Sequence, residues 1–314
     1  MDASIQGLHH VTATVGDAQQ DLDFYGRVLG LRLVKQTVNF DNHHVFHFYY
    51  GNERGTPGTL MTTFPYKGKG VATGRKGAGQ ITATGFSVPE ASLPGWRRRL
   101  AGLGVGVLDE GTRFGERYLS VEDPSGLVIE LIGAGSDERV PWRNPDVAPE
   151  LAIRGVHSVS LTIGIPEPSI ALLTGLLGYR VRGEEERRTR LEVGDGGPGR
   201  SLDILAAPEA PVALNGLGTV HHVAMAVATP AEQLAYRGRL VELGVPVTEV
   251  LDRQYFRSIY FREPGGVLYE IATVPPGFLV DEPLERLGTT LKLPPWEEPH
   301  RLAIEAGLPA ITHP

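Results

Sequence analysis

Apolar and polar positions follow the same order four times along the chain. Each time, an alternating run typical of a β-strand precedes an amphipathic helical segment, and further alternating runs carry Pro/Gly turns. The opening runs read "GLHHVTATV", "GQITATGFSV", "RGVHSVSLTIG" and "GTVHHVAMAVA". This internal repeat predicts four β-α-β-β-β modules.

Local signals support the modules. In the first one, Asp17 is a candidate N-cap, and Leu22, Tyr25 and Leu29 form a helical apolar stripe that ends at Gly30. The second and fourth modules end alike, with the turns "DPSG" and "EPGG" each followed by three mostly apolar residues and a glutamate. The same turn in phase with flanking helix and strand signals is stronger evidence than the turn alone.

A β-α-β-β-β module cannot bury both faces of its own sheet, so modules are expected to pair. We therefore predict an α+β fold with four modules paired into two domains, each a curled mixed sheet that forms a cup with helices outside. A polar, proline-containing stretch separates the halves of the chain. The predicted parts are an N-terminal domain (1–135), a linker (136–150), a C-terminal domain (151–274) and a tail (275–314) with a short helix in "PHRLAIEAG".

Composition narrows the function. The net charge of -7 is spread over interspersed acids and bases, which disfavours nucleic acid or an anionic membrane as a partner. No apolar run approaches the roughly 20 residues of a membrane span, so we expect a soluble, cytoplasmic protein; a homo-oligomer is left open. The chain has no cysteine, which excludes disulfides and thiolate metal sites. Any metal must be held by imidazole and carboxylate groups.

Alignment of the repeats sorts the histidines. His10 and His222 take one position in their modules, and Ser158 takes it in the third. Because side chains alternate between the faces of a strand, a cup built from the first and fourth modules would present His10, His222 and Glu270 inward. Glu270 lies at the end of the fourth module, and Thr62 takes the corresponding position in the first. Thr62 would form the fourth corner of the site, but it cannot bind a metal. We predict a metal site at His10, His222 and Glu270.

This donor set has a chemical implication. Two histidines and one carboxylate with open positions are the ligands of non-heme Fe(II) oxygenases, because substrate and O2 must both reach the metal. The remaining histidines receive no such role. His157 aligns with His9 and is interpreted as a packing residue, and the pair His43 and His44 matches no repeat position.

The chain resembles the vicinal oxygen chelate superfamily, which includes glyoxalases, extradiol dioxygenases and antibiotic-resistance binders. The segments "GLHHVTATVGD", "KQTVNFD", "HFYYGNERGTPGT", "DRQYFRSIYFREPGGVLYEIAT" and "LKLPPWEEPHR" resemble its ring-cleaving, hydroquinone-type dioxygenase branch. The resemblance covers essentially the whole chain. It implies Fe(II) as the cofactor, O2 and a small aromatic compound as substrates, and metal ligands at the three residues already derived.

The resemblance also implies residues around the metal. These are His9, Thr12, His221, Arg253 and Tyr260. Arg253 or His221 would stabilise a bound oxygen anion, and Tyr260 or His221 would donate a proton. Simple alternation of the strand points His9 away from the cup. Arg257 replaces Arg253 if the register of the loop differs.

Two other functions stay open at this point. A glyoxalase-like isomerase or lyase would use four protein ligands, and threonine at position 62 counts against it. A metal-free small-molecule binding protein of the same fold would need no His-His-Glu set. The sequence does not separate hydroquinone from catechol substrates.

Overall fold

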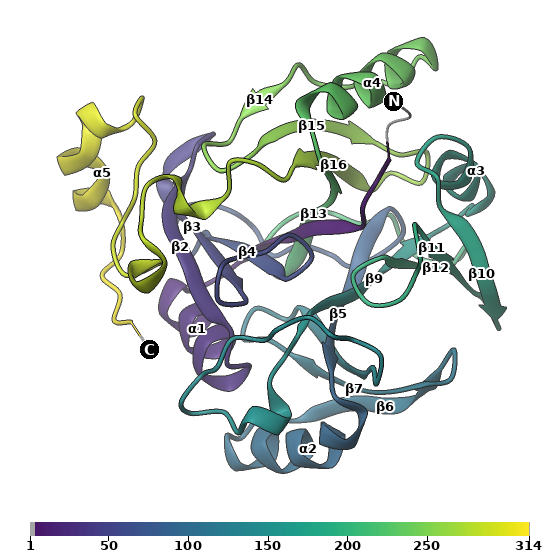
Figure 1. Cartoon of the computed structure of the whole chain (residues 1–314), viewed down its shortest axis with the longest axis horizontal. Helices are drawn as coiled ribbons and strands as arrows, with labels where there is room; N and C mark the ends of the chain where they lie inside the picture. The colour runs from purple at the N-terminus through teal and green to yellow at the C-terminus, as the bar shows by residue number, and fades with distance from the viewer. Residues whose placement is uncertain (1–3, 314) are drawn as a thin grey trace.

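The computed structural model describes residues 4–313 and contains two eight-stranded mixed sheets with helices outside them (Figure 1). The strands of the first sheet are β1 (Leu8–Val15), β2 (Arg32–Asn39), β3 (Asn42–Gly51), β4 (Leu60–Pro65), β13 (Thr219–Val227), β14 (Leu251–Asp252), β15 (Arg257–Arg262) and β16 (Leu268–Thr273). Those of the second sheet are β5 (Gln80–Val88), β6 (Val107–Arg113), β7 (Glu116–Glu122), β8 (Val128–Gly133), β9 (Gly155–Ile163), β10 (Arg180–Glu185), β11 (Arg188–Glu192) and β12 (Ser201–Ala206). The predicted α+β fold of curled mixed sheets is confirmed.

The sheets do not follow the order of the chain. The first sheet has the order β14-β15-β16-β13-β1-β4-β3-β2 and so joins the fourth module to the first. The second sheet, β10-β11-β12-β9-β5-β8-β7-β6, joins the third module to the second. Each sheet therefore takes one module from either side of residues 136–150, and the boundaries predicted for the two domains stay a prediction.

Strand register supports the repeat alignment. In each module the opening strand runs parallel to the closing strand. The residue at the end of the module, equivalent to Glu270, pairs with the residue two places after the position of His10 or His222. The facing pairs are Thr12 with Thr62, Gly85 with Glu130, Ser160 with Asp203 and Ala224 with Glu270. The alignment that gave Thr62 the position of Glu270 is therefore correct, and Asp203 takes the same position in the third module.

The core lies between the sheets and the helices that cover them. One apolar cluster includes Val11, Ile81, Val159 and Val223, one residue from each opening strand. The covering helices are α1 (Ala18–Leu22), α2 (Leu93–Gly102), α3 (Glu167–Gly175) and α4 (Pro230–Glu242). Asp17 caps α1 as predicted, since its side chain accepts hydrogen bonds from the backbone N–H groups of residues 19 and 20. Among residues 4–313, no helix is long and apolar enough to cross a membrane.

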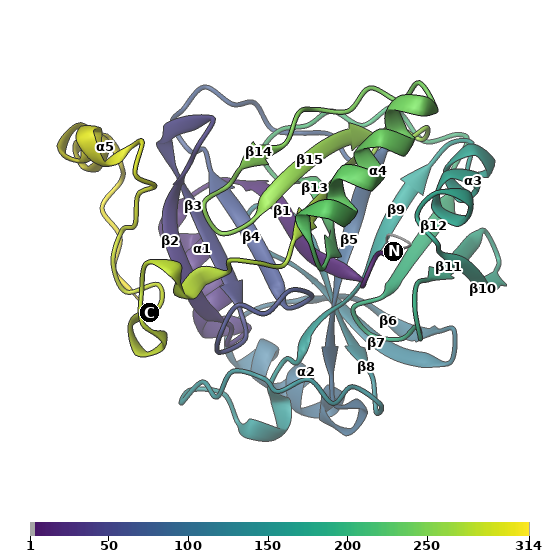
Figure 2. The ribbon, with the colours of Figure 1, turned by 45° about the horizontal axis from the view of Figure 1, so that its top comes forward.

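The tail follows the β2 edge of the first sheet and ends in α5 (Arg301–Gly307), close to the predicted helix (Figure 2). Lys35 on β2 is fully buried and binds the carboxylates of Asp281, at 2.6 Å, and Glu282. Phe278 packs edge-on against Tyr49 of β3, with ring centroids 5.1 Å apart. Because a buried ammonium group needs close counter-charges, these contacts hold the tail against the first sheet.

Candidate active site

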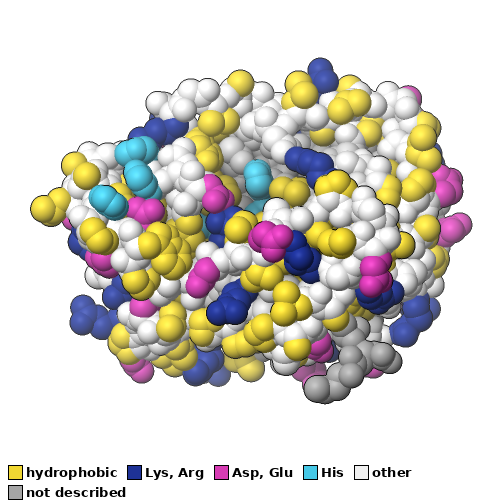
Figure 3. Space-filling model, turned by 90° about the horizontal axis from the view of Figure 1, so that it is seen from above, with side chains coloured by type: hydrophobic (Ala, Val, Ile, Leu, Met, Phe, Trp, Pro, Cys, Tyr) yellow, Lys and Arg dark blue, Asp and Glu magenta, His cyan; other side chains and the backbone are white. Residues whose placement is uncertain are grey.

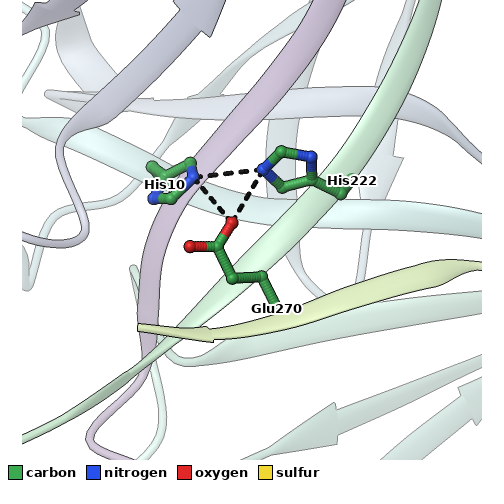
Figure 4. A group of neighbouring side chains, drawn as sticks. All are labelled: His10, His222 and Glu270. Atoms are coloured by element: carbon green, nitrogen blue, oxygen red, sulfur yellow. Dashed lines mark hydrogen bonds and ion pairs between the residues drawn. The ribbon is translucent and has the colours of Figure 1, made fainter. Parts of the chain in front are cut away.

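Three side chains from three strands of the first sheet meet at one point (Figure 4). His10 on β1 and His222 on β13 bring their Nε2 atoms to 3.2 Å, although 212 positions separate them in the chain. The Oε2 atom of Glu270, on β16, lies 3.3 Å from His10 Nε2 and 2.9 Å from His222 Nε2. All three residues are buried. The structure thus brings together the three predicted ligands.

The three donor atoms are arranged as ligands of a divalent metal rather than as hydrogen-bond partners of one another. Among the described residues, Glu270 Oε2 accepts no hydrogen bond of acceptable geometry, despite the two nearby imidazoles. Burial acts to raise the pKa of Glu270, but the adjacent His10 and His222 outweigh burial and hold that pKa well below its usual value. Burial lowers the pKa of His222, and so does neighbouring His10. A carboxylate and two neutral imidazoles are the protonation states that bind a metal.

Two β-bulges orient the histidines that precede the ligands. In the β1–β13 ladder, Leu8 faces Met225 while His10 faces Ala224, so His9 is an extra residue; His221 is the extra residue between Val220 and His222. His9 Nδ1 lies 2.9 Å from His10 Nδ1, and His221 Nδ1 lies 2.8 Å from His222 Nδ1. The bulge thus turns His9 toward the ring of His10, a contact that simple alternation did not predict, while His9 stays outside the cavity lining.

These contacts determine which nitrogens carry hydrogens. A ligand histidine that keeps the lone pair on Nε2 carries its hydrogen on Nδ1 and donates it to the neighbouring ring. His9 then carries its own hydrogen on Nε2, and it also makes a hydrogen bond with the Thr273 backbone. Burial and the adjacent ligand histidine lower the pKa of His9 and of His221 to about 3, so both are neutral. A neutral ring is required here, because Nδ1 of His9 and of His221 must keep a lone pair to accept the hydrogen bond from the ligand histidine.

The fourth corner of the site is closed by hydroxyl groups. Thr62 Oγ1 lies 2.8 Å from Thr12 Oγ1 and 2.9 Å from His47 Nε2. His47 Nδ1 lies 2.9 Å from Tyr49 Oη. Burial, reinforced by His10, His222 and Arg253, holds the pKa of His47 well below its usual value. The sequence pattern did not identify His47 and Tyr49 as residues of the site. They lie two positions apart on one strand, so both side chains point to the same face.

Arg253 and Tyr260 both reach the site, as the resemblance implies. Arg253 Nε donates to Tyr260 Oη at 3.2 Å, and the guanidinium makes two bonds to the carboxylate of Asp41. Tyr260 packs edge-on against His222, with centroids 5.6 Å apart. Arg257 is exposed and does not line the cavity. Ser258 donates to the second oxygen of Glu270, a supporting contact that the sequence analysis did not identify.

A cavity of about 550 Å³ opens beside these groups. Figure 3 shows the hollow on this face, with histidine side chains visible inside it. His221 lines the cavity, whereas His9 does not. Apolar side chains form much of its wall: Phe40, Phe64, Val71, Leu251, Phe256 and Leu268. A largely apolar cavity with a few convergent polar groups is typical of a small-molecule site.

In the second sheet, the groups at the equivalent positions make ion pairs. Glu130, which corresponds to Glu270, accepts two hydrogen bonds from Arg113 at 2.8 and 3.2 Å. Asp203 is bound by Arg190 at 2.8 Å. His157 takes the bulge position of His9 and bonds to Glu116 at 3.0 Å, so it has a charged partner as well as a packing role.

Comparisons with known proteins find relatives along nearly the whole chain. The family model described as "Glyoxalase/Bleomycin resistance protein/Dioxygenase superfamily" matches residues 7–131 and 155–271. MhqE of Bacillus subtilis (strain 168), named as a ring-cleaving dioxygenase, is 44% identical over 98% of this chain and 99% of its own. The chlorohydroquinone/hydroquinone 1,2-dioxygenase of Sphingobium indicum is 40% identical over 93% of this chain and 92% of its own.

Solved structures extend the comparison. A crystal structure named as a dioxygenase from Bacillus subtilis superposes with a TM-score of 0.94 at 40% identity, over 99% of both chains. Glyoxalase I from Zea mays superposes with a TM-score of 0.63 at 16% identity, over 85% of this chain and 92% of its own. At that identity the maize enzyme shows a shared fold alone.

Proposed function

Because the chain belongs to the glyoxalase/bleomycin resistance protein/dioxygenase superfamily, we propose that it is an Fe(II)-dependent dioxygenase that cleaves the ring of a hydroquinone- or catechol-type aromatic. The observation that carries the proposal is the buried triad of His10, His222 and Glu270 beside a largely apolar cavity. Two imidazoles and one carboxylate leave coordination positions for both substrate and O2. When bound, Fe(II) supplies the redox centre through which electrons pass from the aromatic ring to O2.

The fourth corner supports ring cleavage over an isomerase mechanism. Thr62 is fully buried and hydrogen-bonded to Thr12 and His47, so it offers no carboxylate to the site. A glyoxalase-like mechanism would use a fourth protein ligand at this corner. Thr12, Thr62 and His47 instead close that side of the site with neutral groups. The substrates would therefore approach the metal from the cavity.

His221 acts as a hydrogen-bond donor to the substrate in this proposal. Its Nδ1 accepts a hydrogen bond from His222, so its hydrogen lies on Nε2, which has no hydrogen-bond partner among the described residues. Because His221 lines the cavity, its N–H can donate to an oxygen of the substrate. His9, its counterpart on β1, instead orients His10 from outside the cavity.

Arg253 and Tyr260 complete the polar groups that face the substrate. Burial acts to lower the pKa of Arg253, but Tyr260 and Asp41 outweigh it, so the guanidinium stays charged. A fixed positive charge stabilises a substrate phenolate. Burial, helped by Glu270, raises the pKa of Tyr260, so its phenol keeps its hydrogen and can act as a donor.

The experiment is an O2-uptake assay on protein loaded anaerobically with Fe(II). We expect uptake with a hydroquinone or a catechol, with one O2 consumed per ring opened. Protein loaded with Zn(II) serves as the control, because zinc cannot exchange electrons with O2. Absence of uptake with both substrate classes would contradict the proposal.

A further inference from the structure

Asp41 occupies the tip of a hairpin at the mouth of the cavity. It lies in the two-residue turn between β2 and β3, and its side chain is 70% exposed. Its Oδ1 and Oδ2 atoms accept hydrogen bonds from the two terminal nitrogens of Arg253, at 3.1 and 3.0 Å. Asp41 comes from the first module and Arg253 from the fourth. The pair therefore links the two modules that build the site.

The turn holds the Asp41 carboxylate in place. The backbone N–H of Asp41 donates to Asn39 Oδ1 at 2.9 Å, and Asn39 Nδ2 donates to Tyr66 Oη at 3.1 Å. The neighbouring Phe40 packs edge-on against Trp296 of the tail, with centroids 5.6 Å apart. Because the turn is anchored on two sides, the carboxylate stays directed at Arg253.

The backbone of Arg253 is held as well. Its N–H donates to Phe256 O at 2.9 Å, and Tyr255 N–H donates to its carbonyl at 2.7 Å. Gln254, between them, has a φ of 65°, which marks a tight turn. The long side chain still has several rotamers, and the bidentate bond to Asp41 selects the one in which Nε meets Tyr260.

The selected rotamer decides the direction of the Tyr260 hydrogen bond. Tyr260 Oη accepts from Arg253 Nε, so its own hydrogen must point away from the guanidinium. We propose that Asp41 is a positioning residue that holds Arg253 and, through Arg253, directs the phenol of Tyr260 toward the substrate. This rests on the function proposed above.

Stability does not account for the pair. Water screens the charge of Asp41, whose side chain is 70% exposed, and both side chains lose freedom in the pair, so it contributes little to folding. Precise placement of a reacting group has a far larger effect on rate than on folding. Asp41 lies at the rim of the cavity and contacts Arg253, which in turn contacts Tyr260. This location favours a role in catalytic geometry.

The test compares Asp41→Asn with Glu249→Gln, both loaded with Fe(II). Glu249 is also an exposed acid paired with an arginine, Arg237, but it does not line the cavity. We expect Asp41→Asn to lower kcat about 10-fold, with unchanged iron content and melting temperature, while Glu249→Gln keeps the wild-type rate. In an Arg253→Ala background, Asp41→Asn should change kcat less than about 2-fold, because its effect passes through Arg253.

A spectroscopic measurement tests the positioning without activity. In protein labelled with ¹⁵N-arginine, the Arg253 Nε–H resonance, assigned with Arg253→Lys, should be protected from exchange in wild type and in Glu249→Gln. The same resonance should exchange rapidly in Asp41→Asn. An unchanged resonance in Asp41→Asn, or an equal loss of rate in the Arg253→Ala background, would overturn the proposal. Absence of O2 uptake by the wild type would instead remove the proposed function, and the resonance would still decide the role of Asp41.

Discussion

Glu130 and Glu270 occupy equivalent positions in the two sheets, yet Glu130 is bound by an arginine and Glu270 lies against two histidines. The difference follows from the opening strands. His10 and His222 stand beside Glu270, whereas the matching positions of the second sheet are Ala83 and Ser158. One architecture therefore supports a candidate metal site in one sheet and an ion-pair cluster in the other.

Removal of one candidate ligand should strongly weaken metal binding. Replacing His222 with alanine leaves His10 and Glu270, and we expect metal affinity to fall by more than about 100-fold. Metal content of anaerobically prepared protein measures the effect. His43→Ala is the matched control, since His43 lies outside the site and pairs with Glu297. Equal iron in His222→Ala and wild type would rule out the triad as the metal site.

The two bulge histidines should differ in their effects. Both orient a ligand ring, so His9→Ala and His221→Ala should each lower metal affinity about 10- to 100-fold. His221 alone of the two lines the cavity, so at saturating Fe(II) we expect only His221→Ala to lower kcat, by about 100-fold or more. Metal titration and O2 uptake separate the two effects. A similar fall of kcat in both variants would contradict the donor role of His221.

Tyr260→Phe tests the phenol. The ring and its contact with His222 are retained and only the hydroxyl is lost, so iron content and folding should not change. We expect kcat to fall about 100-fold or more if this hydroxyl transfers a proton. Tyr118→Phe, which loses a hydroxyl bonded to Asp109 in the second sheet, is the control. Retention of the wild-type kcat in Tyr260→Phe would exclude the phenol from proton transfer.

A buried carboxyl should make the folding stability depend on pH. Burial raises the pKa of Asp21 from 3.8 to about 7, even though Thr63 and Tyr50 donate hydrogen bonds to it. The folded state then binds a proton more tightly than the unfolded state. The stabilisation is complete below about pH 4 and is lost as the pH rises through 7, so the free energy of unfolding falls over this range.

Asp21→Asn removes this titration. Between pH 5 and pH 8 the free energy of unfolding of wild type should fall by about 2 to 3 kcal/mol more than that of the variant, because one pKa unit corresponds to about 1.4 kcal/mol. Asp123, whose pKa burial raises to about 6, is present in both proteins, and its charge is a smaller additional cause of the raised pKa of Asp21. Thermal melts at both pH values measure the difference. Parallel pH profiles would show that Asp21 does not titrate as stated.

The sequence predicted the triad because its residues occur at repeated positions. His10 and His222 align with each other, Glu270 aligns with Glu130, and strand alternation then places all three on one face. The orientation of His9 could not be predicted in this way. A bulge adds one residue to a strand without any signature in the apolar pattern. Here it turns the side chain of His9 toward the ring of His10.

Other residues of the site lack a repeat that would identify them. His47 lies in the run "VFHFYY", which indicates a strand but assigns no chemistry to one histidine among aromatic residues. Asp41 and Ser258 act through single side-chain contacts whose partners lie far away in the chain or across a ladder. Such contacts follow from tertiary geometry, which local sequence patterns do not encode.

The pairing of the first module with the last has a consequence for biosynthesis. His10 leaves the ribosome long before its partner strands β13 and β16, which emerge only after residues 219 and 268 have been translated. Until then β1 lacks a neighbour on its β13 side, while the second and third modules can already pair with each other. A metal ion would therefore meet the complete candidate site only after β16 has emerged, when the second and third modules have already had time to fold.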